Sequence, residues 1–451
     1  MTQSQDRGER AVLATVALAA ILAPLNSTMI AVALPRVVDD FHSSVGSAGW
    51  LVTSYLLALA VVQPVAGKLG DRHGRRPFVL GGLLVFGLAS LGAAVASSLA
   101  LLIAFRVAQA VAGAVVFPNG AGLVRELIPA GRRARAFGMV GAAIALAAAL
   151  GPPLGGLLIS VGGWQSIFYV NIPLVAAALV LAWRSIPRRT AVAVSQAPFD
   201  WLGSALFAVV LGGVAALVIE GRHSSSSLVP VLSGIALVAI AAVFIRRELR
   251  HPDPVLQPRY FTRRGFAAAS AGVAASNLGF YTMLLATPIL LSRQHHWSSL
   301  QTGLVLAFLS APMVALSPVG GRLADRYGRR APSVMGCALL VAGLAPLAVS
   351  PGLGSVGLFA CLALAGSGVG LSSAGLQTSA VEAVDPAQAG VASGLFSTCR
   401  YIGSFAGSIA LARLLDSGHG LTGFRAVFAM ALGGALVSVV ATAVMPSRQT
   451  T

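Results

Sequence analysis

Charged side chains are scarce in this sequence. Only 10% of its 451 residues are charged, whereas 56% are hydrophobic, and a soluble domain carries about 25% charged residues. Only 14 residues are acidic, and none of them stands deep inside an apolar run. This scarcity excludes an ordinary soluble globular domain and indicates a chain that crosses a membrane many times.

Cysteines and clustered histidines are also few, which excludes several kinds of site. Cys337, Cys361 and Cys399 stand in apolar runs without a CxxC spacing or a neighbouring histidine, so we expect neither a disulfide nor a metal site. The apolar runs contain no HExxH motif, no Ser/His/Asp set and no histidine cluster. Because a membrane enzyme needs such a set, we expect no enzymatic activity and no cofactor.

Basic residues are plentiful but scattered. The net charge is +17, yet the arginines occupy short loops and form no continuous stripe, so nucleic acid is excluded as a partner. With the N-terminus inside, 24 basic residues fall in inside segments and 5 in outside segments, in agreement with the positive-inside rule. We therefore expect a multi-pass protein of a bacterial inner or plasma membrane with both termini cytoplasmic, Ser224–Ser227 outward and Arg246–Arg264 inward.

Apolar runs of about 20 residues are abundant, and this length crosses a hydrocarbon core of about 30 Å. Asn26-Ser27-Thr28 interrupts the first run, which favours a retained helix over a cleaved signal peptide. The runs lie near residues 11–31, 45–66, 78–97, 99–121, 136–160, 166–186, 202–220, 228–245, 265–291, 298–319, 332–350, 354–377, 388–412 and 424–445. They predict an all-α membrane protein with fourteen transmembrane helices: a six-helix bundle (1–189), a linker with two extra helices (190–264) and a second six-helix bundle (265–451).

One charged segment occurs twice. The first copy runs from Gly67 to Pro77, and the second runs from Gly321 to Arg330, 254 residues later. Both copies hold an aspartate, two glycines and several arginines at the same spacing between two apolar runs. A short basic loop explains the arginines but not the repeated spacing, so the pattern indicates two similar halves.

The repeated segment resembles the signature loop of the major facilitator superfamily, and further motifs narrow the resemblance. These motifs are Leu25–Pro35, Trp50–Tyr55 with Gln63-Pro64, Arg106–Gln109 with Gly113, Gly151–Gly156, Trp164–Phe168, Asn171–Pro173 and Asp200–Gly203. Together with the inserted helix pair, they are similar to the 14-helix drug:proton antiporter branch of that superfamily.

The resemblance implies two six-helix bundles that rock about a central cavity, with the inserted pair at the periphery. It implies an exporter of the multidrug or antibiotic-resistance kind, which exchanges a lipophilic small molecule for protons across the lipid bilayer. We expect this exporter to act as a monomer.

The repeated segment is expected to form a conformational latch. Asp71 and Asp325 can face the positive N-terminus of a helix from the opposite half, near Ala387 and Ala134 respectively, when the cytoplasmic side is closed. The arginines can pair with a glutamate in their own half. The expected latch residues are Gly67, Asp71, Arg72, Gly74, Arg75, Arg76 and Glu126 in the first half, and Asp325, Arg326, Arg329, Arg330 and Glu382 in the second.

A second group of residues is expected in the substrate cavity or in proton coupling. Arg106 stands about seven residues inside the fourth run and shares a helical face with Gln109. A charge within the bilayer needs a partner or water, and the resemblance assigns this arginine to proton coupling; a structural arginine is the alternative. Arg400 invites the same interpretation, and the resemblance adds Asn26 and Tyr55.

The antiporter motif comprises Gly151, Pro152, Gly155 and Gly156. Gly151 and Gly155 form a GxxxG pair beside Pro152, which permits close helix contact and removes one backbone hydrogen bond. The motif is expected to act as a hinge or a tight seal. Ordinary small-residue packing is the alternative.

Asn26 departs from the pattern of the resembled branch, which has an aspartate at this place. Because asparagine cannot titrate, the export of cations is disfavoured, and a neutral or anionic substrate near Arg106 or Arg400 fits better. The alternative function is a facilitator or importer of such a compound without proton coupling. A channel or receptor is disfavoured because the two-half repeat implies rocking.

Overall fold

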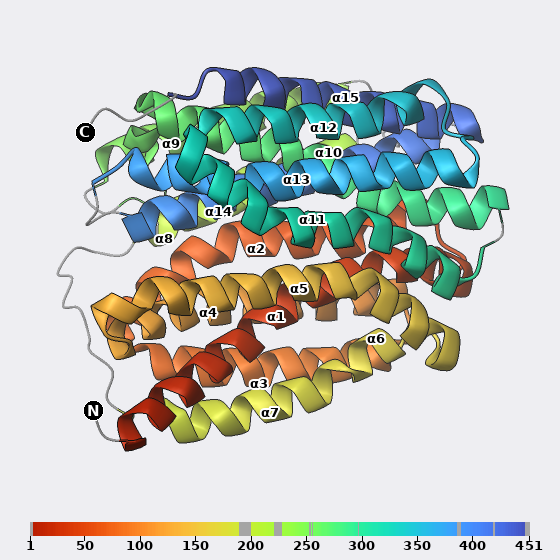
Figure 1. Ribbon diagram of the computed structural model, residues 1–451. Coiled ribbons are helices and arrows are strands. Elements are labelled where there is room, and N and C mark those ends of the chain that lie inside the picture. Colours follow the sequence, from red (N-terminus) through yellow and green to blue (C-terminus); the bar gives the residue numbers. More distant parts are fainter. Residues whose placement is uncertain are drawn as a thin grey trace. The chain divides into compact units, whose positions relative to one another are not determined.

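Helices are the only regular secondary structure among the residues that the structure describes (Figure 1). The computed structural model describes residues 3–188, 200–220, 228–251, 254, 256–295, 297–385, 389–417 and 420–446. The α-helices are α1 (Gln3–Asp40), α2 (Val45–His73), α3 (Arg75–Ala94), α4 (Leu99–Leu127), α5 (Ala130–Gly162), α6 (Ser166–Tyr169), α7 (Asn171–Ser185), α8 (Trp201–Glu220), α9 (Leu228–Arg250), α10 (Arg264–His295), α11 (Ser299–Tyr327), α12 (Arg330–Val349), α13 (Ser355–Glu382), α14 (Ala389–Ser417) and α15 (Leu421–Ala443). A 3-10 helix, η1 (Pro258–Thr262), precedes α10.

The prediction of an all-α protein with fourteen long helices is confirmed. Within the described chain, α6 and α7 together fill one predicted span, and each other predicted span corresponds to one helix. Among the residues that the structure describes, thirteen helices are long and apolar enough to cross a membrane. The remaining one, α14, carries Arg400 near its middle. Ser224–Ser227, expected to face outward, lie outside the described residues.

The structure breaks the helix predicted near residues 166–186. The one-turn helix α6 ends at Tyr169, and α7 begins at Asn171. Pro173 has no N–H group to donate to the carbonyl of residue 169, so a continuous helix would lose a hydrogen bond here. The Asn171 side chain bridges the break by donating to the Ile167 carbonyl at 3.3 Å.

The loop predicted within each repeated segment is shorter than expected, because the preceding helix continues into it. α2 extends to His73 and α11 to Tyr327, so both aspartates of the repeat lie in last turns of helices. The chain reverses at Gly74, with φ 85°, and at Gly328, with φ 82°, a backbone region that favours glycine. These two glycines are 254 residues apart, so the repeat recurs in the backbone as well as in the sequence.

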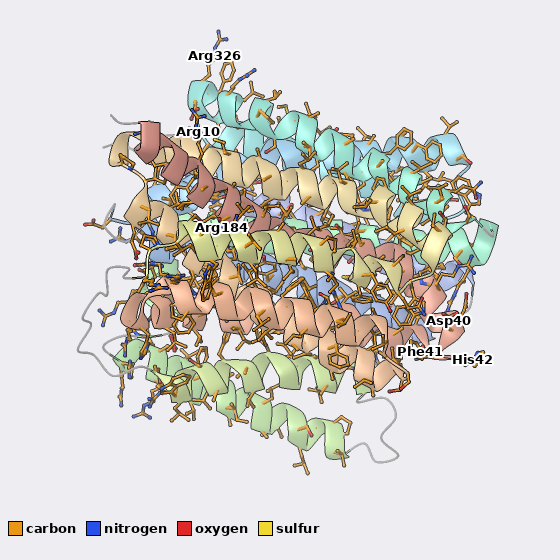
Figure 2. All side chains as sticks on the ribbon, turned by 90° about the horizontal axis from the view of Figure 1, so that it is seen from below. Arg10, Asp40, Phe41, His42, Arg184 and Arg326 are labelled. Carbon is orange, nitrogen blue, oxygen red and sulfur yellow. The ribbon has the colours of Figure 1, made fainter. Side chains whose placement is uncertain are left out.

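The described helices group into two compact units. Unit 1 contains α1, the part of α2 from Ala58, α3 to α7, and residues Trp297–Leu304 at the start of α11. Within it, α1 packs on α5, and α3 packs on α4 and α7. Its apolar core includes Leu22, Leu83 and Phe86. Figure 2 shows Arg10 and Arg184 toward one end of this unit and Asp40, Phe41 and His42 at the other.

Unit 2 contains residues Ser44–Leu57 of α2, α8 to α10, α11 from Val305, and α12 to α15. Within it, α12 packs on α13 and α15, α10 packs on α14 and α15, and the inserted helices α8 and α9 pack on each other. Tyr260, Phe266 and Phe396 belong to an apolar cluster that joins the segment before α10 to α14.

Candidate functional site

A buried arginine is the main polar feature of unit 1. Arg106 and Gln109 lie one turn apart on α4, and both side chains are fully buried, as is Asn26 on α1. The Arg106 Nη1 group donates to the side-chain oxygen of Asn26 and, at 3.2 Å, to that of Gln109. Helix α1 thus supplies a hydrogen-bond acceptor to a charged side chain whose burial in the bilayer would otherwise be unfavourable.

The hydrogen bonds continue from Gln109 onto α3. Gln109 Nε2 donates to Ser90 Oγ at 2.7 Å, and that hydroxyl donates to the Phe86 carbonyl at 2.7 Å. We call Asn26, Arg106, Gln109 and Ser90 the polar chain. It joins α1, α4 and α3 through buried side chains.

The chemistry of the polar chain is that of a fixed positive charge. Guanidinium stays protonated in proteins, and amide and hydroxyl side chains do not titrate near neutral pH. The Nδ2 group of Asn26 is buried without a hydrogen-bond partner among the described residues. The arrangement can attract an anion or donate to a neutral acceptor, but it cannot itself exchange a proton with solvent.

The antiporter motif lies on α5 beside the asparagine helix. A side chain at Gly155 would contact Met29 at 3.2 Å, and one at Gly151 would contact the Leu25 carbonyl at 3.3 Å. On another face of α5, Gly156 approaches Gly303 within the same unit, with 3.2 Å between a built Cβ and the facing Cα. Glycine is therefore required here by the close approach of helices.

Tyr55 and Arg400 belong to unit 2. Tyr55 is fully buried on α2. Two residues earlier, Thr53 exchanges a 3.0 Å hydrogen bond with Ser408 of α14. Arg400, half-buried on α14, places its guanidinium 5.4 Å from the centre of the Tyr401 ring, close enough for a cation–π contact.

The first copy of the repeated segment forms a charged cluster in unit 1. Arg75, at the start of α3, is only 7% exposed. Its guanidinium donates to Asp71 one turn earlier and to Glu126 near the end of α4. We call these three residues the first clasp. Arg72 is half-buried in the last turn of α2.

The outer residues of the first copy make other contacts. Arg76 donates to the Trp183 carbonyl at 3.1 Å, and its guanidinium lies 5.3 Å from the centre of that indole ring. Arg76 therefore pairs with α7 rather than with Glu126. Gly67 lies against Pro118 of α4, where an added Cβ would make an ordinary 3.4 Å contact.

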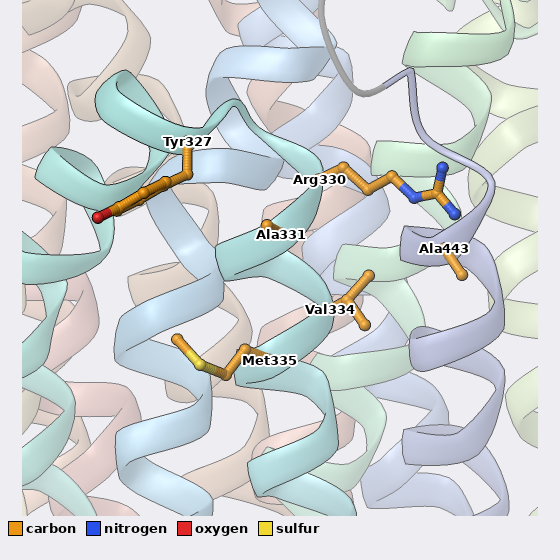
Figure 3. Close-up of a pocket in the computed structure, with 6 residues that line it drawn as sticks. All are labelled: Tyr327, Arg330, Ala331, Val334, Met335 and Ala443. Carbon is orange, nitrogen blue, oxygen red and sulfur yellow. The ribbon is translucent and has the colours of Figure 1, made fainter.

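The second copy repeats the arrangement in unit 2. Arg329 donates to Asp325 at 2.7 Å and to Glu382 of α13 at 2.8 Å, and we call these three residues the second clasp. The hydrogen bond that Arg329 donates to Glu382 raises the pKa of Arg329 above its ordinary value. Arg326 lies 5.3 Å from the centre of the Tyr327 ring, and Arg330 extends toward the part of α15 that carries Ala443 (Figure 3).

These contacts do not test the partners that the two latch aspartates are expected to have in the opposite half. Ala387 lies outside the described residues, and the side chain of Ala134 is likewise not described. Each aspartate forms an ion pair with the arginine of its own clasp. The latch role therefore stays a prediction.

A family model of the Major Facilitator Superfamily matches residues 16–408 and, in a second match, residues 269–450. The chain belongs to this superfamily. It is therefore a multi-pass membrane transporter, as the resemblance of the repeated segment implies, and not an enzyme.

Relatives in the superfamily agree with the drug:proton antiporter branch. The chain is 38% identical over 437 residues to the MFS-type transporter YvkA of Bacillus subtilis (strain 168), which covers 96% of each chain. It is 34% identical over 393 residues to the multidrug resistance protein Stp of Mycobacterium tuberculosis (strain ATCC 25618 / H37Rv), covering 87% of this chain and 73% of Stp. It is 31% identical over 418 residues to the tetracenomycin C resistance and export protein of Streptomyces glaucescens, covering 90% and 76%.

A solved structure supports the same fold. The human organic anion transporter MFSD10 (TETRAN) is similar with a TM-score of 0.66 and 19% sequence identity, over 96% of this chain and 99% of that chain. At this identity the likeness concerns the major facilitator fold alone.

Two buried carboxylates in unit 2 are not predicted by the sequence pattern. Asp200 is 1% exposed and Glu248 is 3% exposed. Asp200 Oδ1 accepts from the Gly203 N–H at 2.8 Å, as an N-cap of α8, and from Arg247 Nε at 2.7 Å. Glu248 accepts from the Leu256 N–H at 2.8 Å. The sequence contains one signal for the position of Asp200: an aspartate directly before an apolar run is a favoured helix N-cap.

These two are the only buried acidic residues in the described part of this superfamily member, and both lie at the inserted helices α8 and α9. None of the described residues of unit 1 contributes a buried carboxylate. The contacts of Asp200 and Glu248 tie the ends of the inserted pair to each other and to the segment that leads into α10.

The two clasps predict a difference in stability. The Glu126 side chain is 19% exposed and Glu382 is 37% exposed, and their arginine partners are 9% and 25% exposed. A buried charged hydrogen bond contributes about 1.5–3 kcal/mol, whereas an exposed ion pair contributes about 0–1 kcal/mol. We therefore expect Glu126→Gln to lower the melting temperature of the purified protein more than Glu382→Gln does.

The two substitutions are chemically identical, so each serves as the control for the other. Melting curves in one detergent at one pH give the comparison. Equal losses, or a larger loss for Glu382→Gln, would contradict the assignment of the first clasp as the stronger one.

Proposed function

We propose that this transporter exports a lipophilic, neutral or anionic small molecule in exchange for protons, by alternating access. Two lines of support come from relatives whose names include multidrug resistance and tetracenomycin C resistance and export. The glycine-rich contacts of α5 on α1 fit a seam that must stay tight while helices move. The substrate would be a drug, an antibiotic or a secreted metabolite.

The observation that carries the substrate class is the hydrogen bond between Arg106 and Asn26. The permanent positive charge of Arg106 here faces the uncharged amide of Asn26, at the place where the resembled branch has an aspartate. A cation entering such a site would lose its water without gaining a counter-ion, which is unfavourable in a low dielectric. An anion or a polar neutral molecule would instead gain hydrogen bonds from the polar chain.

Proton coupling requires a group that titrates, and the polar chain has none. This favours a second candidate function: a facilitator or importer of the same class of compound that uses no protons. The two candidates differ in their response to the proton gradient. An antiporter stops accumulating or expelling substrate when that gradient collapses, whereas a facilitator continues to equilibrate it.

We also propose that the two clasps are part of a latch that favours the outward-open form. The aspartates lie in last turns of α2 and α11, next to the two glycines at which the chain reverses. A carboxylate so placed can face a helix N-terminus when the cytoplasmic side closes. Loss of that contact would bias the two-state equilibrium toward the inward-open form.

Asn26→Asp tests the substrate class. The new carboxylate would lie against Arg106, cancel its charge and offer a counter-ion to a lipophilic cation. We expect the variant to gain efflux of ethidium and to lose efflux of an anionic dye, each by about tenfold or more, since burial of an unpaired charge costs several kcal/mol. The measurement is dye efflux from a pump-deficient host at matched expression, with and without an uncoupler that collapses the proton gradient.

Two further variants control this test. Gln109→Glu adds a carboxylate to the same arginine from α4 and should act like Asn26→Asp. Asn26→Leu removes the amide without adding charge and should not confer ethidium efflux. Wild-type protein that already expels ethidium as well as the Asp variant would refute the substrate class, and efflux that persists with the uncoupler would favour the facilitator.

Asp71→Asn tests the latch. Removing a charge from a helix end costs about 0.3–2 kcal/mol, enough to change the populations of two states severalfold. We expect single cysteines introduced into the central cavity to react severalfold more with a thiol reagent added from the cytoplasmic side, while the protein stays folded and inserted. Asp325→Asn should have the same effect, and a fall in transport with unchanged cysteine reactivity would argue against the latch.

A further inference from the structure

A groove opens at the start of α12 in unit 2 (Figure 3). It encloses about 380 Å³ and is lined by Tyr327, Arg330, Ala331, Val334, Met335 and Ala443. Four of these six side chains are aliphatic, and Met335 and Tyr327 remain 47% and 59% exposed. The groove therefore combines an apolar wall with one cationic side chain at its end.

Arg330 extends across the end of this groove toward the part of α15 that carries Ala443 (Figure 3). Its exposed side chain makes no hydrogen bond or ion pair with a residue that the structure describes. The nearby carboxylates of Asp325 and Glu382 are both engaged by Arg329. Arg330 is thus a cation beside an apolar surface, and the two carboxylates near it are already paired with Arg329.

The first copy of the repeat shows what fills the corresponding place. Arg76 precedes Arg330 by 254 residues, and it stacks on Trp183 in the last turn of α7 and donates to its carbonyl. On the α15 side, the groove beside Arg330 is lined by Ala443, the last residue of that helix.

Further positive charge surrounds the groove. Arg264 donates to the carbonyl of Val444, the neighbour of Ala443, at 3.1 Å. Arg326 lies over the ring of Tyr327, another lining residue. Guanidinium groups bind phosphate through paired N–H donors, so this end of the groove is suited to a phosphate group.

We propose that the groove binds an anionic phospholipid, with the headgroup phosphate at Arg330 and an acyl chain along Ala331, Val334, Met335 and Ala443. The apolar wall lies on a transmembrane helix, and the charge lies at that helix's arginine-rich end, which matches the division of a lipid into chain and headgroup. A free phosphate would use only the charge, and a neutral lipid only the wall. The occupied groove would give Arg330 the partner that Trp183 gives Arg76.

Lipid binding by the full-length protein tests the proposal. The protein, purified in detergent, is titrated with phosphatidylglycerol or with phosphatidylcholine of the same chain length, and bound lipids are counted by native mass spectrometry. We expect the wild type to prefer phosphatidylglycerol. Arg330→Gln should weaken this binding about fivefold, as one basic residue near an anionic surface contributes, and Ala443→Trp should weaken it at least as much by filling the groove.

Arg76→Gln is the matched control, because Arg76 is held by the carbonyl and the ring of Trp183, and it should leave phosphatidylglycerol binding unchanged. All variants are first compared by melting temperature and gel filtration, and the exposed Arg330→Gln decides the result if Ala443→Trp fails to fold. Equal binding of the two lipids by the wild type would overturn the proposal, as would unchanged binding in Arg330→Gln. A dimer that Ala443→Trp dissociates would assign the groove to a second copy and overturn it as well. No transport is measured, so the outcome is independent of the proposed export function.

Discussion

The burial of the Arg106 guanidinium is the constraint on which the rest of unit 1 depends. A charged side chain at the centre of a bilayer costs at least a few kcal/mol. Here the charge is fully buried, and it donates to amide oxygens from two helices. Gln109 in turn donates a hydrogen bond to Ser90. A shift of α1 along its axis would therefore remove an acceptor from Arg106, and a shift of α3 would remove the acceptor of Gln109.

The same constraint connects packing with transport. Asn26 holds the arginine, and the next turn of α1, with Thr28 and Met29, lies directly against the glycines of α5. In the proposed mechanism, a substrate that reached the polar chain would act on the helices that must move for access to alternate. An asparagine at this place offers the arginine no negative charge at any pH, unlike the aspartate of the resembled branch.

Sequence predicts the helices well because hydropathy and the repeated turn are local signals. It fails where contacts are set by packing. The break before Asn171 depends on a single residue, Pro173, and the hydropathy of the surrounding apolar run does not reveal it. Arg106 and Gln109 are visible as neighbours on one helix, but Ser90, and the pair of Asp200 with Arg247, come together only through tertiary structure. Arg76 and Arg330 are equivalent in sequence, yet Trp183 and Ala443 give them different surroundings.

A double-mutant cycle between Asn26 and Arg106 tests the central claim most directly. The free energy of unfolding is measured for the wild type, Asn26→Leu, Arg106→Met and the double variant in one detergent. If Asn26 holds the buried charge, Asn26→Leu costs about 1.5–3 kcal/mol in the wild type and little once the arginine is gone, which gives a coupling energy of about 1–3 kcal/mol. Additive losses would contradict the claim, because the two side chains would then stabilise the protein independently.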